Sequence, residues 1–126
     1  MLRLILRLQA LYYFLTGLWP LLHLASFEAM AGPIADDWLA HAVGLLGLVI
    51  ATALWLGTRH RQVPPDKAIV ALGALSALAI AAIELFYGLS GRLSGLYLAD
   101  AAFEIALVIA MGLALTIGWS RQRPGF

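Results

Sequence analysis

Residues 38–57 read WLAHAVGLLGLVIATALWLG, a run of 20 residues in which His41 is the one ionisable side chain. A helix needs about 20 mostly apolar residues to cross the hydrocarbon core of a bilayer. Three further runs have the same character, at residues 8–27, 68–88 and 96–119. The sequence therefore predicts an all-α membrane protein, a four-transmembrane-helix bundle in which residues 1–126 form a single transmembrane domain.

The composition of the chain also indicates a lipid environment. Apolar residues make up 63% of its 126 residues and charged residues 12%, whereas soluble domains have about 45–50% and about 25%. The formal net charge of +1 leaves no excess of basic residues for binding nucleic acid. Because cysteine is absent, disulfides, thiolate metal sites and cysteine nucleophiles are excluded. We expect the lipid bilayer as a partner and no nucleic acid.

Short connections separate the four runs. Gly32-Pro33 and Pro64-Pro65-Asp66 cannot continue a helix, and Asp36 or Asp37 and then Ser94 are placed to cap the helices that follow. The first run also has features of a cleavable signal peptide, with arginines before it and small residues after it. It is longer than the usual signal-peptide core of about 7–15 residues, so we expect a true span.

The basic residues predict how the chain is oriented. Seven of the eight lie at the N-terminus, in the middle connection or at the C-terminus, which share one side of a four-span protein: Arg3, Arg7, Arg59, Arg61, Lys67, Arg121 and Arg123. Lys and Arg are retained on the cytoplasmic side during insertion. We therefore expect a multi-pass protein of the bacterial inner membrane with both termini cytoplasmic. Six of the seven carboxylates then fall on the outer side or in the outer part of a span.

An internal repeat relates the second and fourth runs. An offset of 59 residues aligns residues 38–57 with residues 97–116, and nine of the twenty positions are identical. Duplication would make the protein two parallel helix-hairpin repeats, in which His41 and Asp100 are equivalent. Chance is the alternative, since both runs are rich in Leu, Ala, Val and Ile.

The ionisable and aromatic residues inside the runs predict a site near the outer face. Asp100 and Glu104 are four residues apart and share one helix face with Tyr97, and Glu84 and Tyr87 form a similar stripe. In the first run Tyr12, Thr16, Trp19 and His23 lie on one face, where Gly17 and Pro20 predict a bend. The predicted ligand-binding residues are His23, His41, Glu84, Tyr87, Tyr97, Asp100, Glu104 and Trp19.

Several functions suit such a site. An acidic pocket would bind a small lipophilic or cationic ligand, which is our first expectation. The alternative is a membrane-embedded acid–base enzyme, an isomerase or cyclase, with Glu104, Asp100 and Glu84 as catalytic candidates. A metal site with His23, His41 and Glu104 and a small proton-coupled transporter are further alternatives. Glu84 and Asp100 would also be explained by side chains that reach the headgroup layer. A homodimer would complete the pocket, and the sequence does not identify a cofactor.

Two resemblances accompany these expectations. The segments at residues 32–39 (GPIADDWL) and 91–100 (GRLSGLYLAD) resemble those of small uncharacterised bacterial four-span membrane proteins, a likeness that implies a fold but no activity. The predicted architecture, without a shared motif, also resembles the emopamil-binding and sigma-2-receptor superfamily. There, helices present acidic residues to a lipophilic ligand, and the resemblance implies such a role for the acidic residues here.

Overall fold

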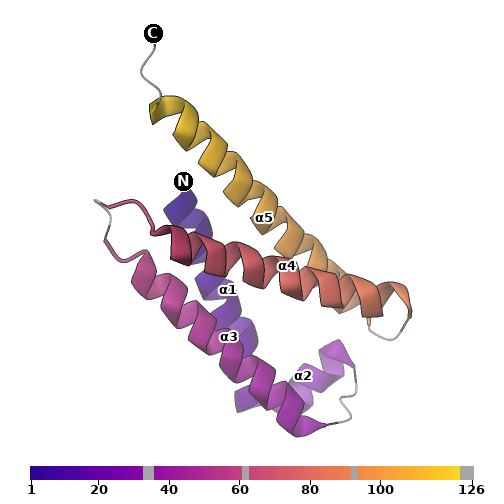
Figure 1. Ribbon diagram of the computed structural model, residues 1–126. Coiled ribbons are helices and arrows are strands. Elements are labelled where there is room, and N and C mark those ends of the chain that lie inside the picture. The colour runs from indigo at the N-terminus through magenta and orange to yellow at the C-terminus, as the bar shows by residue number, and fades with distance from the viewer. Residues whose placement is uncertain (33–35, 61–62, 92–93, 123–126) are drawn as a thin grey trace.

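The structure is all-helical over the residues that it describes. This computed structural model describes residues 1–32, 36–60, 63–91 and 94–122, the last five by their backbone alone. Its helices are α1 (Leu2–Leu22), α2 (Leu24–Ala31), α3 (Asp37–Gly57), α4 (Lys67–Leu89) and α5 (Gly95–Gln122) (Figure 1). α3, α4 and residues 95–117 of α5 are long and apolar enough to cross a membrane, and α1 with α2 would add a fourth, bent span. The all-helical fold class is confirmed, with three to four helices suited to a membrane.

The helix ends follow the predicted breaks, although the capping differs. Asp66 precedes α4, and its Oδ1 accepts a hydrogen bond of 3.3 Å from the backbone N–H of Ala68. Asp36 precedes α3, but its side chain makes no capping hydrogen bond. The Oγ of Ser94, just before α5, has no hydrogen-bond partner among the described residues. α2 ends at Ala31 and is followed by Gly32, whose φ of +98° favours glycine, and Pro33 lies outside the described residues.

The first predicted span, residues 8–27, is not one continuous helix. α1 begins at Leu2 and ends at Leu22, and the chain then turns by 114° into α2. The break falls at His23, whose Nδ1 accepts a hydrogen bond of 3.1 Å from the backbone N–H of Ser26. The predicted bend is therefore a complete break a few residues after Pro20, because the imidazole of His23 caps a new helix.

The long helices pack mainly as two pairs, α1 with α3 and α4 with α5 (Figure 1). α1 and α3 cross at Gly17 and Gly44, where a Cβ atom on either glycine would lie 2.6 Å from the backbone oxygen of the other. Small residues at a crossing allow helix backbones to approach closely, which is a common basis of helix association in membranes. The two glycines therefore bring α1 and α3 together.

The buried apolar core lies at one end of the molecule. It contains Ile5, Leu6, Ala10, Leu54, Leu107, Met111 and Ala114, from the first half of α1, the end of α3 and the middle and later part of α5. We call this the core end, and we call the opposite end, with α2 and the starts of α3 and α5, the α2 end. Elsewhere the long helices expose apolar side chains such as Leu45, Leu75 and Leu113, as helices that contact lipid do.

Candidate functional site

A buried group of polar side chains lies between α1, α4 and α5. The Tyr13 hydroxyl donates a hydrogen bond of 2.7 Å to Oε2 of Glu104, and the two side chains are 3% and 1% exposed. The neighbouring Tyr12 hydroxyl donates to Oδ1 of Asp100. Glu84 of α4 is 8% exposed and lies within hydrogen-bonding range of the Asp100 carboxyl. We call these five side chains the carboxyl–tyrosine cluster.

Helix periodicity brings the cluster together. Asp100 and Glu104 are four residues apart and therefore lie on one face of α5. Tyr12 and Tyr13 are adjacent on α1, so their hydroxyls reach different turns of α5. On α4 the buried residues Gly73, Ala77, Ala81 and Glu84 form one stripe. At Gly73 this stripe faces α1, where a Cβ atom would lie 2.7 Å from Leu6 and 2.8 Å from the Gln9 amide, and Glu84 continues the stripe toward the α2 end.

The cluster has more carboxyls than hydrogen-bond donors. Tyrosine hydroxyls serve Asp100 and Glu104, but Oε2 of Glu84 is buried and has no hydrogen-bond partner among the described residues. Among the described residues, the charged side chains that act on Glu84 and Glu104 are other carboxyls. A hydrogen bond between two carboxyl groups requires one proton. The contact between Glu84 and Asp100 is therefore suited to sharing a proton.

Gln9 extends the polar region toward the core end. It is fully buried, its Nε2 donates a hydrogen bond of 2.8 Å to the backbone oxygen of Gly73, and its amide lies within hydrogen-bonding range of Tyr13. Beyond Gln9, Leu6 and Leu54 are both 0% exposed and belong to the apolar core. This polar region thus ends at Gln9, and the side chains of Leu6 and Leu54 that follow it are aliphatic and closely packed.

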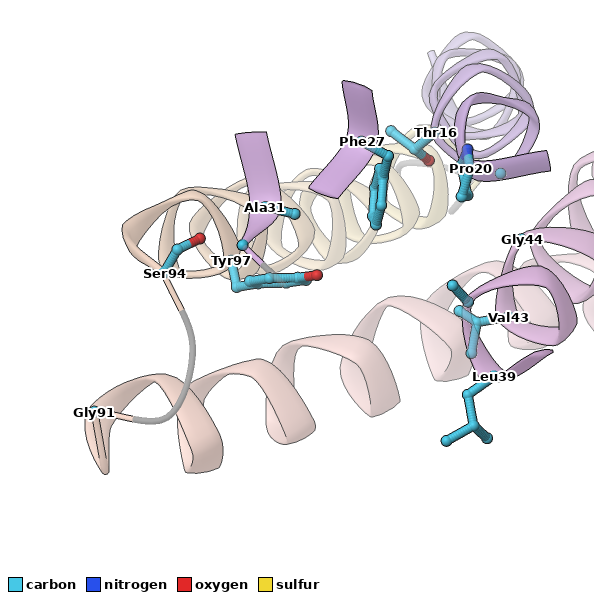
Figure 2. A pocket seen from close by; sticks show the side chains of 13 residues that line it. Thr16, Pro20, Phe27, Ala31, Leu39, Val43, Gly44, Gly91, Ser94 and Tyr97 are labelled. Carbon is cyan, nitrogen blue, oxygen red and sulfur yellow. The ribbon is translucent and has the colours of Figure 1, made fainter. Parts of the chain in front are cut away.

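A cavity of about 720 Å³ lies beneath α2, where α1, α2, α3 and α5 meet. Figure 2 shows Phe27 of α2 and Tyr97 of α5 extending into it from different sides, with Pro20 and Val43 farther along its wall. Ser94, whose Oγ is unpartnered among the described residues, also lines the cavity. The lining is mostly apolar with a few polar groups, as in binding sites for small molecules, which have volumes of about 300–1,000 Å³.

Tyr97 and Thr16 connect the cavity to the cluster. Tyr97 lines the cavity and lies within electrostatic range of Glu84 and Asp100. Thr16 also lines the cavity, and its Oγ1 donates a hydrogen bond of 2.8 Å to the backbone oxygen of Tyr12. The carboxyls themselves are not among the lining residues. The cluster is therefore a second layer behind the cavity wall.

The structure brings the three predicted carboxyls together but not the two predicted histidines. His23 is exposed at the break between α1 and α2, where it caps α2. His41 is exposed on α3. The structure therefore does not place either histidine beside the carboxyls, because one histidine is used at a helix end and the other faces outward; their role in ligand binding stays a prediction. Within the described ranges, no group of three or more His, Asp or Glu side chains is placed to hold a metal ion.

The three predicted aromatic residues have different surroundings. Trp19 donates a hydrogen bond of 2.8 Å from Nε1 to Oγ of Ser26 and packs edge-on against Phe27, with 5.4 Å between ring centroids. It thereby holds α2 in place over the cavity. Tyr87 is exposed and packs against Phe86 at 5.1 Å. Of the predicted ligand-binding residues, Tyr97 alone lines the cavity.

The sequence analysis missed Tyr13 and Gln9. Gln9 is an amide within an apolar run, and Tyr13 follows it after four residues on the same helix face. Polar side chains within a span usually face the interior of the protein. The four-residue spacing of Gln9 and Tyr13 therefore indicates a buried polar face on this helix. It does not identify Glu104 as the partner of Tyr13.

Comparisons with protein-family models, with curated proteins and with solved structures gave no match for this chain. We therefore infer its function from the carboxyl–tyrosine cluster and the adjoining cavity.

Proposed function

We propose that this chain is a multi-pass membrane protein that binds a small lipophilic ligand in the cavity beneath α2. The observation that carries the proposal is the position of this mostly apolar cavity directly in front of a buried carboxyl–tyrosine cluster. The cavity is about 720 Å³ in volume, which suits a ligand of several rings. The apolar lining would provide affinity, and Tyr97 and Ser94 would orient the ligand.

In this proposal the four long helices form a four-span bundle in a bacterial inner membrane, with both termini cytoplasmic. The distribution of charge supports this orientation. Arg3, Arg7, Arg59 and Lys67 lie at the core end, in or beside the start of α1, the end of α3 and the start of α4. Basic residues stay on the cytoplasmic side, so the α2 end and its cavity would face outward.

The proposal also treats the chain as two helix hairpins, α1 with α3 and α4 with α5. The predominance of these two pairs in the packing supports such an organisation. Under the 59-residue offset Asp100 belongs to the cluster, whereas its counterpart His41 is exposed. A duplicated origin would therefore have left the carboxyls of the cluster in the second half only, with Tyr12 and Tyr13 contributed by the first half. The homodimer stays a prediction.

Ligand binding is favoured over the predicted acid–base enzyme. A general acid or base must come within hydrogen-bonding reach of the reacting group. Glu84, Asp100 and Glu104 lie behind the cavity wall and are not among its lining residues. From that position a carboxyl influences a ligand through its charge.

Binding from one side is likewise favoured over transport. An ion path needs polar groups or water along its whole length. The polar side chains from Glu84 to Gln9 are followed by the packed core around Leu6 and Leu54. This arrangement supports a site open at the α2 end and closed at the core end.

A tryptophan substitution at the cavity provides the test. The protein is purified into lipid nanodiscs, and saturable binding of two probes is measured against empty nanodiscs: neutral triphenylphosphine oxide and cationic tetraphenylphosphonium. Val43 and Val49 are both exposed side chains of α3, but Val43 lines the cavity and Val49 is not among its lining residues. We expect at least one probe to bind with 1:1 stoichiometry, Val43→Trp to weaken that binding at least tenfold, and Val49→Trp to leave it unchanged. The proposal fails if neither probe saturates the protein or if the two tryptophan variants behave alike.

A further inference from the structure

We infer that the ligand of this cavity carries a positive charge and that its binding releases the proton shared by Glu84 and Asp100. The inference deepens the proposed function and rests on it, because it takes the cavity as the binding site. It adds two properties: the charge of the ligand and a proton exchanged for it.

The first step is the unpaired acceptor on Glu84. This side chain is 8% exposed, and its Oε2 has no hydrogen-bond partner among the described residues. A buried carboxylate without donors or a counter-charge is costly in free energy. With the cavity empty, the pair formed with Asp100 avoids that cost by sharing one proton. A cation bound nearby would stabilise the negative charge of the pair, so the shared proton would no longer be needed.

The second step is the set of groups around Glu84. Among the described residues, the titratable groups that face it from the neighbouring helices are Tyr12 of α1 and Tyr97, Asp100 and Glu104 of α5. Each of these groups is neutral when protonated and negatively charged when deprotonated, so none supplies a positive charge. Arg92, which the sequence places near this end, lies outside the described residues. The described surroundings therefore leave the positive charge to a proton or to a ligand.

The third step is the position of Tyr97. Its ring extends into the cavity (Figure 2), and it lies within electrostatic range of both Glu84 and Asp100. A cation over the face of a tyrosine ring is attracted by the ring. A cation held there also lies in the field of the carboxyls, which is strong in a medium of low dielectric constant. Tyr97 thus couples the cavity to the Glu84–Asp100 pair.

The exchange is balanced in charge. The protein with an empty cavity holds one proton between Glu84 and Asp100. When a monovalent cation enters the cavity, the O–H bond of the protonated carboxyl breaks, the proton passes to water, and the pair gains one negative charge. One cation enters and one proton leaves. By linkage, the affinity for the cation should then rise about tenfold for each unit of pH while the pair is protonated.

The test measures tetraphenylphosphonium binding to the nanodisc-embedded protein between pH 5 and pH 9, together with proton release in weak buffer containing a pH indicator. Tetraphenylborate, an anion of nearly the same shape, is the matched probe. We expect up to one proton released per tetraphenylphosphonium bound, an affinity that rises with pH, and at least tenfold weaker binding of tetraphenylborate.

Variants identify the group that exchanges its proton. Glu84→Gln should abolish both the proton release and the pH dependence and lower tetraphenylphosphonium affinity at least tenfold at high pH. Glu84→Asp should retain the pH dependence. Glu28→Gln, which removes a carboxyl of α2 outside the cluster, should behave like the unmodified protein. Circular dichroism of each variant checks that the helices are intact.

The two proposals fail in different ways. Tetraphenylphosphonium binding that depends on Val43 but shows no proton release and no effect of Glu84→Gln overturns the exchange and leaves the binding site in place. Proton release that persists in Glu84→Gln also overturns it. Binding that is insensitive to Val43→Trp overturns the proposed function itself.

Discussion

The hydroxyl of Tyr13 on α1 hydrogen-bonds to Oε2 of Glu104 on α5 over 2.7 Å, and both side chains are almost completely buried. The bond joins helices from the two packing pairs, since α1 packs mainly on α3 and α5 mainly on α4. Two further hydrogen bonds join the same two pairs, from Tyr12 to Asp100 and from Gln9 to the backbone oxygen of Gly73, so polar side chains contribute to holding the pairs together. Stability and the proposed site therefore depend on the same residues.

Removing the hydroxyl of Tyr13 should destabilise the protein. Tyr13→Phe leaves the buried carboxyl of Glu104 without its donor, and we expect the free energy of unfolding to fall by about 1–2 kcal/mol. Unfolding by SDS in mixed micelles measures this change. In a Glu104→Leu background the same substitution should have a smaller effect. Equal effects in the two backgrounds would show that the bond contributes nothing.

The glycine crossing of α1 and α3 should tolerate no side chain. In Gly17→Ala or Gly44→Ala the new Cβ atom would lie 2.6 Å from a backbone oxygen, so the helices must separate. We expect a loss of about 1–3 kcal/mol in the same unfolding experiment. Gly112→Ala on α5 is the control, because its Cβ atom would have nothing within 4 Å. It should be neutral or stabilising by up to about 1 kcal/mol; destabilisation of this variant as large as that of Gly17→Ala would contradict the steric explanation.

The stability of the packing between the N-terminal part of α1 and the end of α3 should depend on Arg7. Its guanidinium lies 4.4 Å from the centre of the Trp55 ring and donates a hydrogen bond of 3.1 Å to the backbone oxygen of Thr58. Arg7→Met should therefore lower stability by about 1–2 kcal/mol and change tryptophan fluorescence. Arg59→Met removes the charge of an exposed arginine nearby and should have little effect. Similar losses for both variants would assign the effect to net charge.

Reporter fusions should reveal the orientation proposed for the membrane. We expect alkaline phosphatase to be inactive when fused after the C-terminus and active when fused after Gly91, because the first lies at the basic side and the second at the α2 end. Green fluorescent protein at the same two positions should give the opposite pattern. Phosphatase activity at the C-terminus would place the cavity on the cytoplasmic side and overturn the proposed orientation.

The all-helical class was predictable because bilayer thickness and backbone hydrogen bonding leave few choices for a chain with long apolar runs. The convergence of Glu84, Asp100 and Glu104 was also predicted, since ionisable groups within a span face the interior of the protein. Spacing along each helix determines which residues share a face, and this local geometry is contained in the sequence.

Contacts between helices were decided by the tertiary structure. The pairing of Tyr13 with Glu104, the closure of the core end by Leu6 and Leu54, and the cavity beneath α2 all depend on how helices distant in sequence are placed against one another. The histidines show the same limit. His23 and His41 had the chemistry of ligands, but the helix break at His23 and the outward face of His41 exclude them from the cluster. Periodicity specifies a face of a helix, whereas the partner of that face is set by packing, because the crossing point and rotation of each helix depend on side chains from several segments at once.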